Sequence, residues 1–454
     1  MSNSGCRVLG AGCWVLCLVL GASAEVLGAV QGAGMPGAGA AQTPQTPQPA
    51  ERITFQQAID RATMNNPTVA VAAAGILRAE GLLRQARSAT RPFVTASVTT
   101  TTLNEGVEFS GSVVTPRNQV TASLTADVPV LAAAAWARRT QAMDNKEIAE
   151  LGAADTRRQV ALATADAYLT ILAARRNLDA VARARDTARA HFDLAHELET
   201  RGSGSRLNAI RAAQQVSTDD VLVETAGLAV YRAQEALGVL VVADGPVDTA
   251  EEPTFTLPPD AAAVSAQSTG VAASLLPFRT DLKLFSREVD AAARVVHDSS
   301  ADWWPSLDAI FLPSAVYPAP FFSTARSWRF LLQANVSLFD SGLRSSLKMQ
   351  RQSALDVSKA NLNAALTLTS SQVRAAREAV ASGERALAGV RAAAEQAQQV
   401  VSIVNVSFRA GAATNIEVID AERSARDADT AVASAEDTLR RARLELLMAL
   451  GRFP

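Results

Sequence analysis

The chain has 454 residues, of which 48% are hydrophobic and 19% are charged, and its formal net charge is −2. Basic and acidic residues are balanced along the sequence, so nothing in it predicts a nucleic-acid partner. Only 5% of the residues are aromatic, so we expect a core of aliphatic side chains and alanine, which suits helices that pack closely through small residues.

Residues 1–24 have the pattern of a secretory signal peptide. Arg7 precedes an apolar run over residues 8–20, and Ala22-Ser23-Ala24 fits the small-x-small cleavage rule. The run is short for a membrane-spanning helix. Every cysteine lies in this segment (Cys6, Cys13 and Cys17). The mature protein is therefore expected to be exported and to fold without disulfides.

The segment that follows, residues 25–52, is predicted to be a disordered leader. It is rich in Gly, Ala, Gln and Pro, a composition that buries too little apolar surface to fold. A lipid anchor on Cys13 stays open as an alternative, although Gly10 stands where a lipoprotein signal carries leucine.

A helix is predicted over residues 53–91, with Thr54 as its N-cap and an interruption at Asn65-Asn66-Pro67. Over residues 92–130 the period changes to two, which predicts a β-hairpin around a polar loop at residues 104–118. Its second strand has an apolar and a polar face. The apolar face carries Val120, Ala122, Leu124, Ala126, Val128 and Val130, and the polar face carries Thr121, Ser123, Thr125 and Asp127.

A helical hairpin is predicted over residues 131–243, with its turn at residues 201–205, followed by a linker at 244–270. The same plan then repeats as a helix (271–304), a β-hairpin (305–339) and a helical hairpin (340–454). Residues 280–312 align without a gap on residues 67–99, and Gly411 falls on Gly202. Because order and spacing both survive, we interpret the chain as an internal duplication.

The second helical hairpin carries the longest pattern. Between residues 355 and 408 the seam positions step by alternating threes and fours, as in the a and d positions of a coiled coil. Three of them are not apolar: Lys359, Thr369 and Gly383. Gly411 is expected to end the first helix and Thr414 or Asn415 to cap the second, in which the seam continues over residues 418–449.

The two β-hairpins together give four strands with apolar outward faces and polar inward faces. Aromatic residues flank the second hairpin: Trp303, Trp304, Tyr317, Phe321, Phe322 and Trp328. This pattern is typical of a membrane β-barrel, and a soluble sandwich is the alternative. Long helices cannot fold back over so small a sheet, and unpaired strand edges in lipid cost several kcal/mol per backbone group. Three copies with twelve strands would close the barrel.

In these features the chain resembles the TolC-like outer membrane efflux proteins. The resemblance spans residues 53–453 and rests on the order and duplication of short motifs. They are Ile53-Thr54-Phe55-Gln56-Gln57-Ala58 with Asn66-Pro67, then Arg91-Pro92 and Trp304-Pro305 before the strands, Leu338-Phe339-Asp340-Ser341-Gly342 after them, and Glu417-Val418-Ile419-Asp420-Ala421 beyond Gly411.

The resemblance implies an α+β, mostly α, internally duplicated fold. Four strands per chain would build a homotrimeric 12-stranded β-barrel in outer membrane lipid, continued by a long periplasmic α-helical barrel. The implied function is a passive channel of a tripartite efflux or type I secretion system. A periplasmic adaptor (membrane fusion protein) and an inner-membrane pump would open its periplasmic tip.

The resemblance also implies where the tip functions. The two helical turns would contact the adaptor through Gly202, Ser203, Gly411 and Ala412. Glu417 and Asp420 stand where the family places acidic residues that ring the narrow end of the tube, and Glu417 replaces an aspartate of well-known members. Six such carboxylates in a trimer would favour cations.

The first half departs from this acidic pattern. Asn208 and Arg211 occupy the corresponding positions, and Arg206 lies near the turn. We hypothesise that Arg206 or Arg211 pairs with Glu417 or Asp420 across adjacent hairpins and holds the tip closed. The alternative is that these arginines are solvated.

No catalytic residue, cofactor or metal is predicted. His191 and His196 are five residues apart, which misses the i, i+4 spacing of a helical metal pair. The competing classes are a periplasmic coiled-coil adaptor, which would need one helical hairpin flanked by half-barrels, and an exported structural coiled coil, which would lack apolar-out strands. The sequence does not choose among drugs, metals and secreted proteins as cargo.

Overall fold

The computed structural model describes residues 50–109, 112–257, 275–319, 321 and 324–453. The predicted signal peptide (1–24), all but the end of the predicted leader (25–52), Phe322 and the junction of the predicted linker with the second-half helix lie outside these residues. The described chain belongs to one compact unit that begins at Ala50.

The described helices confirm the duplicated, mostly helical plan. They are α1 (Phe55–Asn65), α2 (Pro67–Ser88), α3 (Ala133–Thr200) and α4 (Arg206–Val241) in the first half, and α7 (Thr280–His297), the 3₁₀ turn η1 (Asp298–Trp303), α8 (Leu343–Arg409) and α9 (Asn415–Ala449) in the second. With 68 and 67 residues, α3 and α8 are each about 100 Å long at about 1.5 Å per residue.

In the described part of the helix predicted over residues 271–304, α7 runs from Thr280 to His297 and then tightens into η1. Trp304 already has an extended backbone, because the ring of the following Pro305 disfavours a helical residue before it.

The break between α1 and α2 follows from local side-chain chemistry. Thr54 and Gln57 form a reciprocal capping box at the start of α1. The Asn66 side chain accepts a 2.9 Å hydrogen bond from the Thr68 amide, and Pro67 occupies the first helical position. Asn66 also donates to the Leu240 carbonyl at 3.1 Å, which ties the break to the end of α4.

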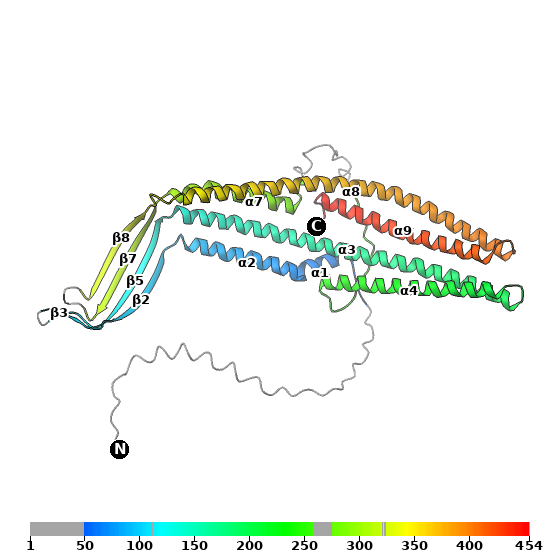
Figure 1. Cartoon of the computed structure of the whole chain (residues 1–454), viewed down its shortest axis with the longest axis horizontal. Helices are drawn as coiled ribbons and strands as arrows, with labels where there is room; N and C mark the ends of the chain where they lie inside the picture. Colours follow the sequence, from blue (N-terminus) through cyan, green and yellow to red (C-terminus); the bar gives the residue numbers. More distant parts are fainter. Residues whose placement is uncertain (1–49, 110–111, 258–274, 320, 322–323, 454) are drawn as a thin grey trace, which may run out of the picture. The chain divides into compact units, whose positions relative to one another are not determined.

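Four antiparallel strands form one sheet in the order β2-β5-β7-β8. The strands are β2 (Phe93–Thr102), β5 (Asn118–Leu131), β7 (Ser306–Tyr317) and β8 (Arg326–Asn335). All of them lie at the same end of the long helices to which they connect (Figure 1). The second β-hairpin, predicted over residues 305–339, ends at Asn335, because the partner of Asn335, Ser306, is the first residue of β7.

Two small sheets correct the expectations from sequence. β1 (Glu51–Ile53), which begins inside the predicted leader, pairs in parallel with β6 (Val247–Thr249), which lies inside the predicted linker. The predicted polar loop at residues 104–118 contains a further pair, β3 (Val107–Phe109) and β4 (Ser112–Thr115). Strands of three or four residues carry too short an alternation to be recognised, and the β1–β6 pairing joins residues far apart in the sequence.

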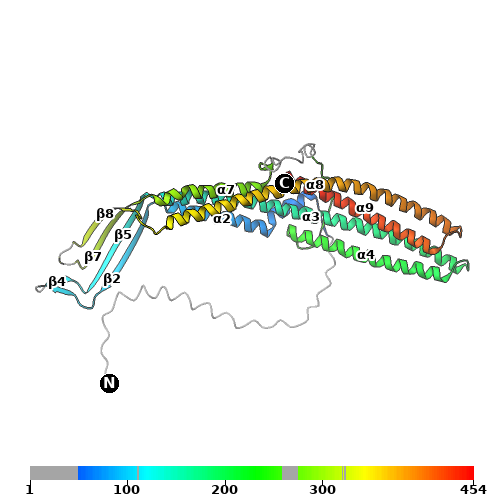
Figure 2. The ribbon, with the colours of Figure 1, turned by 45° about the horizontal axis from the view of Figure 1, so that its top comes forward.

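The helices pack as two hairpins that also contact each other. α3 packs on α4, α8 packs on α9, and α3 contacts α9 (Figure 2). One core centres on the fully buried Tyr168, whose hydroxyl donates to the Glu251 carbonyl at 2.9 Å beside the β1–β6 pair. A second core lies between α8 and α9, where a Cβ on Gly383 would meet the Leu439 side chain at 3.3 Å. This close approach explains why the seam carries a glycine there.

None of the helices in the described part of the chain is apolar over a long enough stretch to cross a membrane.

Candidate functional site

The two helical turns that were predicted as tips have the expected backbone. Gly202 and Gly411 have φ values of +74° and +77°, a left-handed conformation that glycine adopts without strain. Ser205 caps α4, and Thr414 caps α9 in a capping box with Glu417. Gly202, Ser203, Gly411 and Ala412 are all exposed, so both turns present their backbones to solvent.

The predicted gate residues are also exposed, but the predicted ion pairs do not form within one chain. Glu417 accepts a 2.8 Å hydrogen bond from the Thr414 amide as part of the capping box. Neither Arg206 nor Arg211 lies within ion-pair distance of Glu417 or Asp420 in the described residues. A latch made of these residues would therefore have to join neighbouring subunits.

Near the turns the two hairpins are joined by a buried chain of hydrogen bonds that sequence reasoning missed. His191 of α3 lies 2.7 Å (Nε2 to Oδ1) from Asn415 of α9, and the Asn415 amide donates to the Asn208 carbonyl of α4 at 3.4 Å. The Phe408 ring packs edge-on against His191. Burial lowers the pKa of His191, and the bond to Asn415 partly opposes this. His191 is therefore a neutral structural bridge.

A second buried link lies further along the same hairpins. Asp219 of α4 accepts hydrogen bonds from Arg426 of α9 at 2.8 Å and from Gln215 at 3.0 Å. Glu422 lies close by with a buried Oε2 that has no hydrogen-bond partner among the described residues. Burial, and secondarily the Asp219 charge, raise the pKa of Glu422 to about 7.

A signal for both links was present in the sequence. Gln215 and Asp219 continue the three-four spacing that begins at Ala212 and resumes at Ala226, and all four residues are buried. His191 likewise stands between Ala188 and Ala195 at seam spacing. Polar residues at seam positions of a coiled coil indicate specific partners across the seam.

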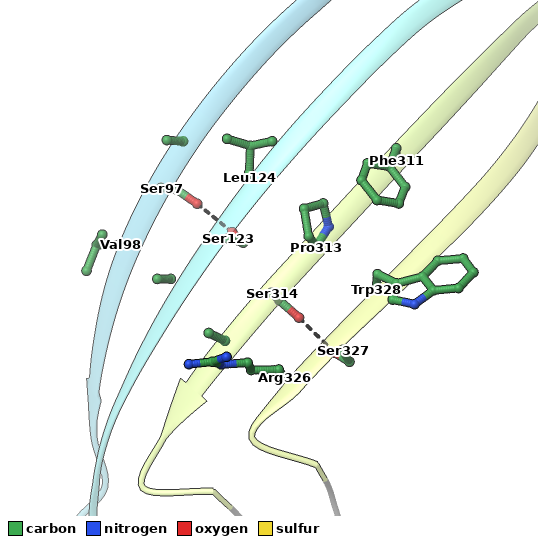
Figure 3. Close-up of a pocket in the computed structure, with 13 residues that line it drawn as sticks. Ser97, Val98, Ser123, Leu124, Phe311, Pro313, Ser314, Arg326, Ser327 and Trp328 are labelled. Carbon is green, nitrogen blue, oxygen red and sulfur yellow. Dashed lines mark hydrogen bonds between the residues drawn. The ribbon is translucent and has the colours of Figure 1, made fainter.

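The sheet has one face that is almost entirely apolar and one that carries most of its polar side chains, together with Ile310, Leu312 and Leu331. Residues directly opposite on neighbouring strands share a face, so the register defines a polar face, which contains Ser123, and an apolar face, which contains Ala122. On the polar face one row runs Ser97–Ser123–Ser314–Ser327 across the whole sheet. The hydroxyl oxygens of Ser97 and Ser123 are hydrogen bonded at 2.8 Å, and those of Ser314 and Ser327 at 2.9 Å (Figure 3).

The apolar face has the features of a surface that contacts lipid. Val98, Phe311, Trp328, Phe330 and Leu332 lie on it and are exposed. It runs along β7 from Leu307 to Tyr317, and at about 3.3 Å per residue and a tilt of about 40° this covers roughly 25 Å of membrane height. Exposed aromatic residues mark both ends of β7, with Trp303 and Trp304 before it, Tyr317 as its last residue and Phe321 beyond it.

No cluster of metal-ligating side chains occurs among the described residues. His196 stacks on Phe192 and does not approach the buried His191.

A duplicated chain whose long helices continue into a two-faced four-stranded sheet is the protomer of a barrel-and-tube channel. The sequence profile of the outer membrane efflux proteins matches residues 58–241 and 274–452. The chain belongs to the outer membrane efflux protein family. The two matched segments coincide with the two halves of the duplication.

Solved structures share the fold over most of the chain. The outer membrane protein VceC of Vibrio cholerae is 19% identical with a TM-score of 0.74, covering 87% of this chain and 96% of its own. A membrane protein of Pseudomonas aeruginosa is 17% identical with a TM-score of 0.77, covering 89% and 92%. The CmeC outer membrane channel of Campylobacter jejuni is 15% identical with a TM-score of 0.74, covering 93% and 94%. No curated protein matches the sequence significantly.

Proposed function

We propose that the protein is the outer membrane channel of a tripartite efflux or type I secretion system. It would act as a passive conduit, with its sheet in the outer membrane and its helices in the periplasm. The observation that supports this most directly is the two-faced sheet, whose outer strands β2 and β8 each pair on one side only among the described residues. Such edges are not tolerated in lipid, so another copy must pair with them.

The proposed assembly is a homotrimer. Three copies supply twelve strands, enough to close a barrel, and the helices that continue from them form the periplasmic tube. Transport needs no catalytic residue, cofactor or metal in this chain. A periplasmic adaptor would contact the turns at Gly202–Ser203 and Gly411–Ala412, and an inner-membrane pump would supply the energy.

We propose Glu417 and Asp420 as the cation-selective constriction at the periplasmic tip. Both side chains lie in the first two turns of α9, next to the exposed turn at Gly411. In a trimer they place six carboxylates near the axis, a field that attracts cations and repels anions. Arg206 or Arg211 of an adjacent hairpin would pair with Glu417 or Asp420, neutralise part of this field and hold the tip closed.

Single-channel conductance in planar bilayers tests the constriction and the latch separately. Glu417→Ala with Asp420→Ala should abolish cation selectivity and cation block, while Asp356→Ala with Glu395→Ala, on exposed positions of α8, should change neither. Arg211→Ala should raise the resting conductance, while Arg232→Ala, further along α4, should not. Unchanged selectivity in the first variant contradicts the constriction, and unchanged conductance in Arg211→Ala contradicts the latch.

The alternative function is a periplasmic adaptor that bridges pump and channel. An adaptor does not span the outer membrane, whereas a barrel extracts from it in detergent as a trimer that dissociates on heating. If the protein is released from the periplasm without detergent and migrates identically before and after boiling, the channel proposal fails.

A further inference from the structure

The apolar face of the four-stranded sheet carries a hollow of about 600 Å³. Two neighbouring rows of the register surround it: Ala96–Leu124–Pro313–Trp328 and Val98–Ala122–Ala315–Arg326. Alanines stand at three of these positions, and larger side chains stand around them. Because the alanine side chains are small and their neighbours are large, the surface over β5 and its neighbouring strands is recessed, and this recess is the hollow.

The hollow opens on the apolar face and not on the polar one. Its lining includes the two rows named above, which lie on the apolar face, and Phe311, which lies on the same face opposite Ala126. The polar face contributes only the serine row between them, whose backbone forms the floor. The flanking polar-face residues Thr95, Thr121 and Leu312 do not line it. In Figure 3 the side chains of Phe311, Pro313 and Trp328 are drawn around this floor.

One charged side chain lies at the rim. Arg326 is the first residue of β8 and lies opposite Ala315 of β7. The exposed Tyr317 is two residues beyond Ala315 on β7. Arg326 is exposed and forms no ion pair with any residue that the structure describes. Arg329, three residues along the same strand, faces the other way, because its partner Leu312 lies on the polar face.

A guanidinium on a lipid-facing surface is costly at the bilayer midplane and tolerated near the interface, where it reaches the headgroups. Arg326 occupies the interfacial end, at the aromatic level marked by Tyr317 and Trp328. Its donors suit the oxygens of a phosphate group. The hollow beside it suits hydrocarbon, since apart from Arg326 and the serine floor its lining is Ala, Val, Leu, Pro, Phe and Trp.

We propose that this hollow is a binding site for a phosphate-bearing lipid, with one acyl chain lying over Ala122 and Ala315 and the headgroup phosphate held by Arg326. The site rests on the proposed location of the sheet in the outer membrane. It adds to that proposal the class of lipid that the barrel surface binds. The hollow spans strands β2, β5, β7 and β8, so a trimer would carry one such hollow per subunit.

The test uses the purified full-length trimer in a neutral detergent and counts bound lipids by native mass spectrometry. The probes are phosphatidylglycerol, bisphosphorylated lipid A and, as the phosphate-free control, diacylglycerol. We expect up to three phosphate-bearing lipids per trimer, with Arg326→Gln weakening binding about tenfold through loss of a charge-assisted contact. Arg329→Gln is the matched control and should bind as the unaltered protein does. Preference for phosphatidylglycerol or lipid A identifies the physiological source.

A second variant separates shape from charge. Ala122→Leu fills the hollow without changing charge, and it should weaken binding of both phosphate lipids. Equal binding of diacylglycerol and the phosphate lipids, or equal loss in Arg326→Gln and Arg329→Gln, overturns the proposal. If the trimer forms and conducts ions while lipid binding is absent, the site is wrong and the channel stands. If no trimer forms in detergent, the channel proposal itself has failed.

Discussion

The Asp219 carboxylate on α4 accepts a 2.8 Å hydrogen bond from the Arg426 guanidinium on α9, and both side chains are largely buried. This pair joins the first helical hairpin to the second within one chain. Gln215 donates to the same carboxylate, and Arg423 donates to Gln215 at 3.3 Å. The network is therefore a second polar connection, besides the one through His191 and Asn415, through which one half of the duplication constrains the other near the tips.

Removing Arg426 should be strongly destabilising. Arg426→Ala leaves the Asp219 charge buried and without its cationic partner, which costs about 3 kcal/mol of the free energy of unfolding. Urea titration followed by circular dichroism measures this loss. Arg232→Ala, an exposed arginine of α4, the helix that carries Asp219, is the control and should change the free energy by less than about 0.5 kcal/mol.

The double variant Asp219→Leu/Arg426→Met tests which of two effects destabilises Arg426→Ala. One is the penalty of leaving the Asp219 charge buried and unpaired, and the other is the loss of a stabilising ion pair. Replacing both partners by apolar side chains is often neutral for stability, so the double variant should be more stable than Arg426→Ala alone. If it is less stable, the ion pair itself stabilises the folded protein, and the penalty of an unpaired charge does not explain the loss in Arg426→Ala.

Glu422 should make stability fall as the pH rises. Burial and the Asp219 charge raise the pKa of Glu422 from 4.5 to about 7 in the folded protein. The folded state therefore keeps a proton that the unfolded state loses. The stabilising contribution is complete below about pH 4.5 and disappears as the pH passes through 7.

Glu422→Gln keeps the shape and removes the charge. It should raise the melting temperature at pH 8 by several degrees and change it little at pH 4.5. Glu395→Gln, on an exposed position of α8, should have no such pH-dependent effect. A shift of equal size at both pH values would show that the glutamine acts through packing.

His191 should act in the opposite direction. Its folded-state pKa is depressed by burial, so the unfolded chain takes up a proton below about pH 6.5 that the folded ring refuses. Stability supplied by the neutral ring is present above that pH and is lost as the pH falls. In a Glu422→Gln background, His191→Gln should abolish the acid-induced drop in melting temperature between pH 7 and 5. If the melting temperature still falls between pH 7 and 5, a titratable group other than His191 is responsible.

The sequence predicts the features of the fold that depend on residues close together in the chain. Period-two alternation locates the membrane-type strands, the capping residues Thr54 and Thr414 locate helix starts, and Gly202 and Gly411 locate the turns. The sequence does not reveal which partner a helix-face charge chooses, since that depends on the relative rotation of α4 and α9. The spacing places Asp219 at a seam position and so indicates a buried partner, but only the packing of the two hairpins identifies that partner as Arg426.

The polar face of the sheet should be accessible to water and the apolar face should not. All native cysteines precede residue 24, so an introduced cysteine in the mature protein reports its own environment. Ser123→Cys points to the polar face, and Ala122→Cys, its neighbour on β5, points to the apolar face. A charged, membrane-impermeant methanethiosulfonate should modify Ser123→Cys and reduce single-channel conductance. The same reagent should leave Ala122→Cys unmodified in a bilayer but react with it after denaturation. Modification of Ala122→Cys with protection of Ser123→Cys would invert the sheet and contradict the barrel, whereas protection of both would indicate a sheet buried within protein.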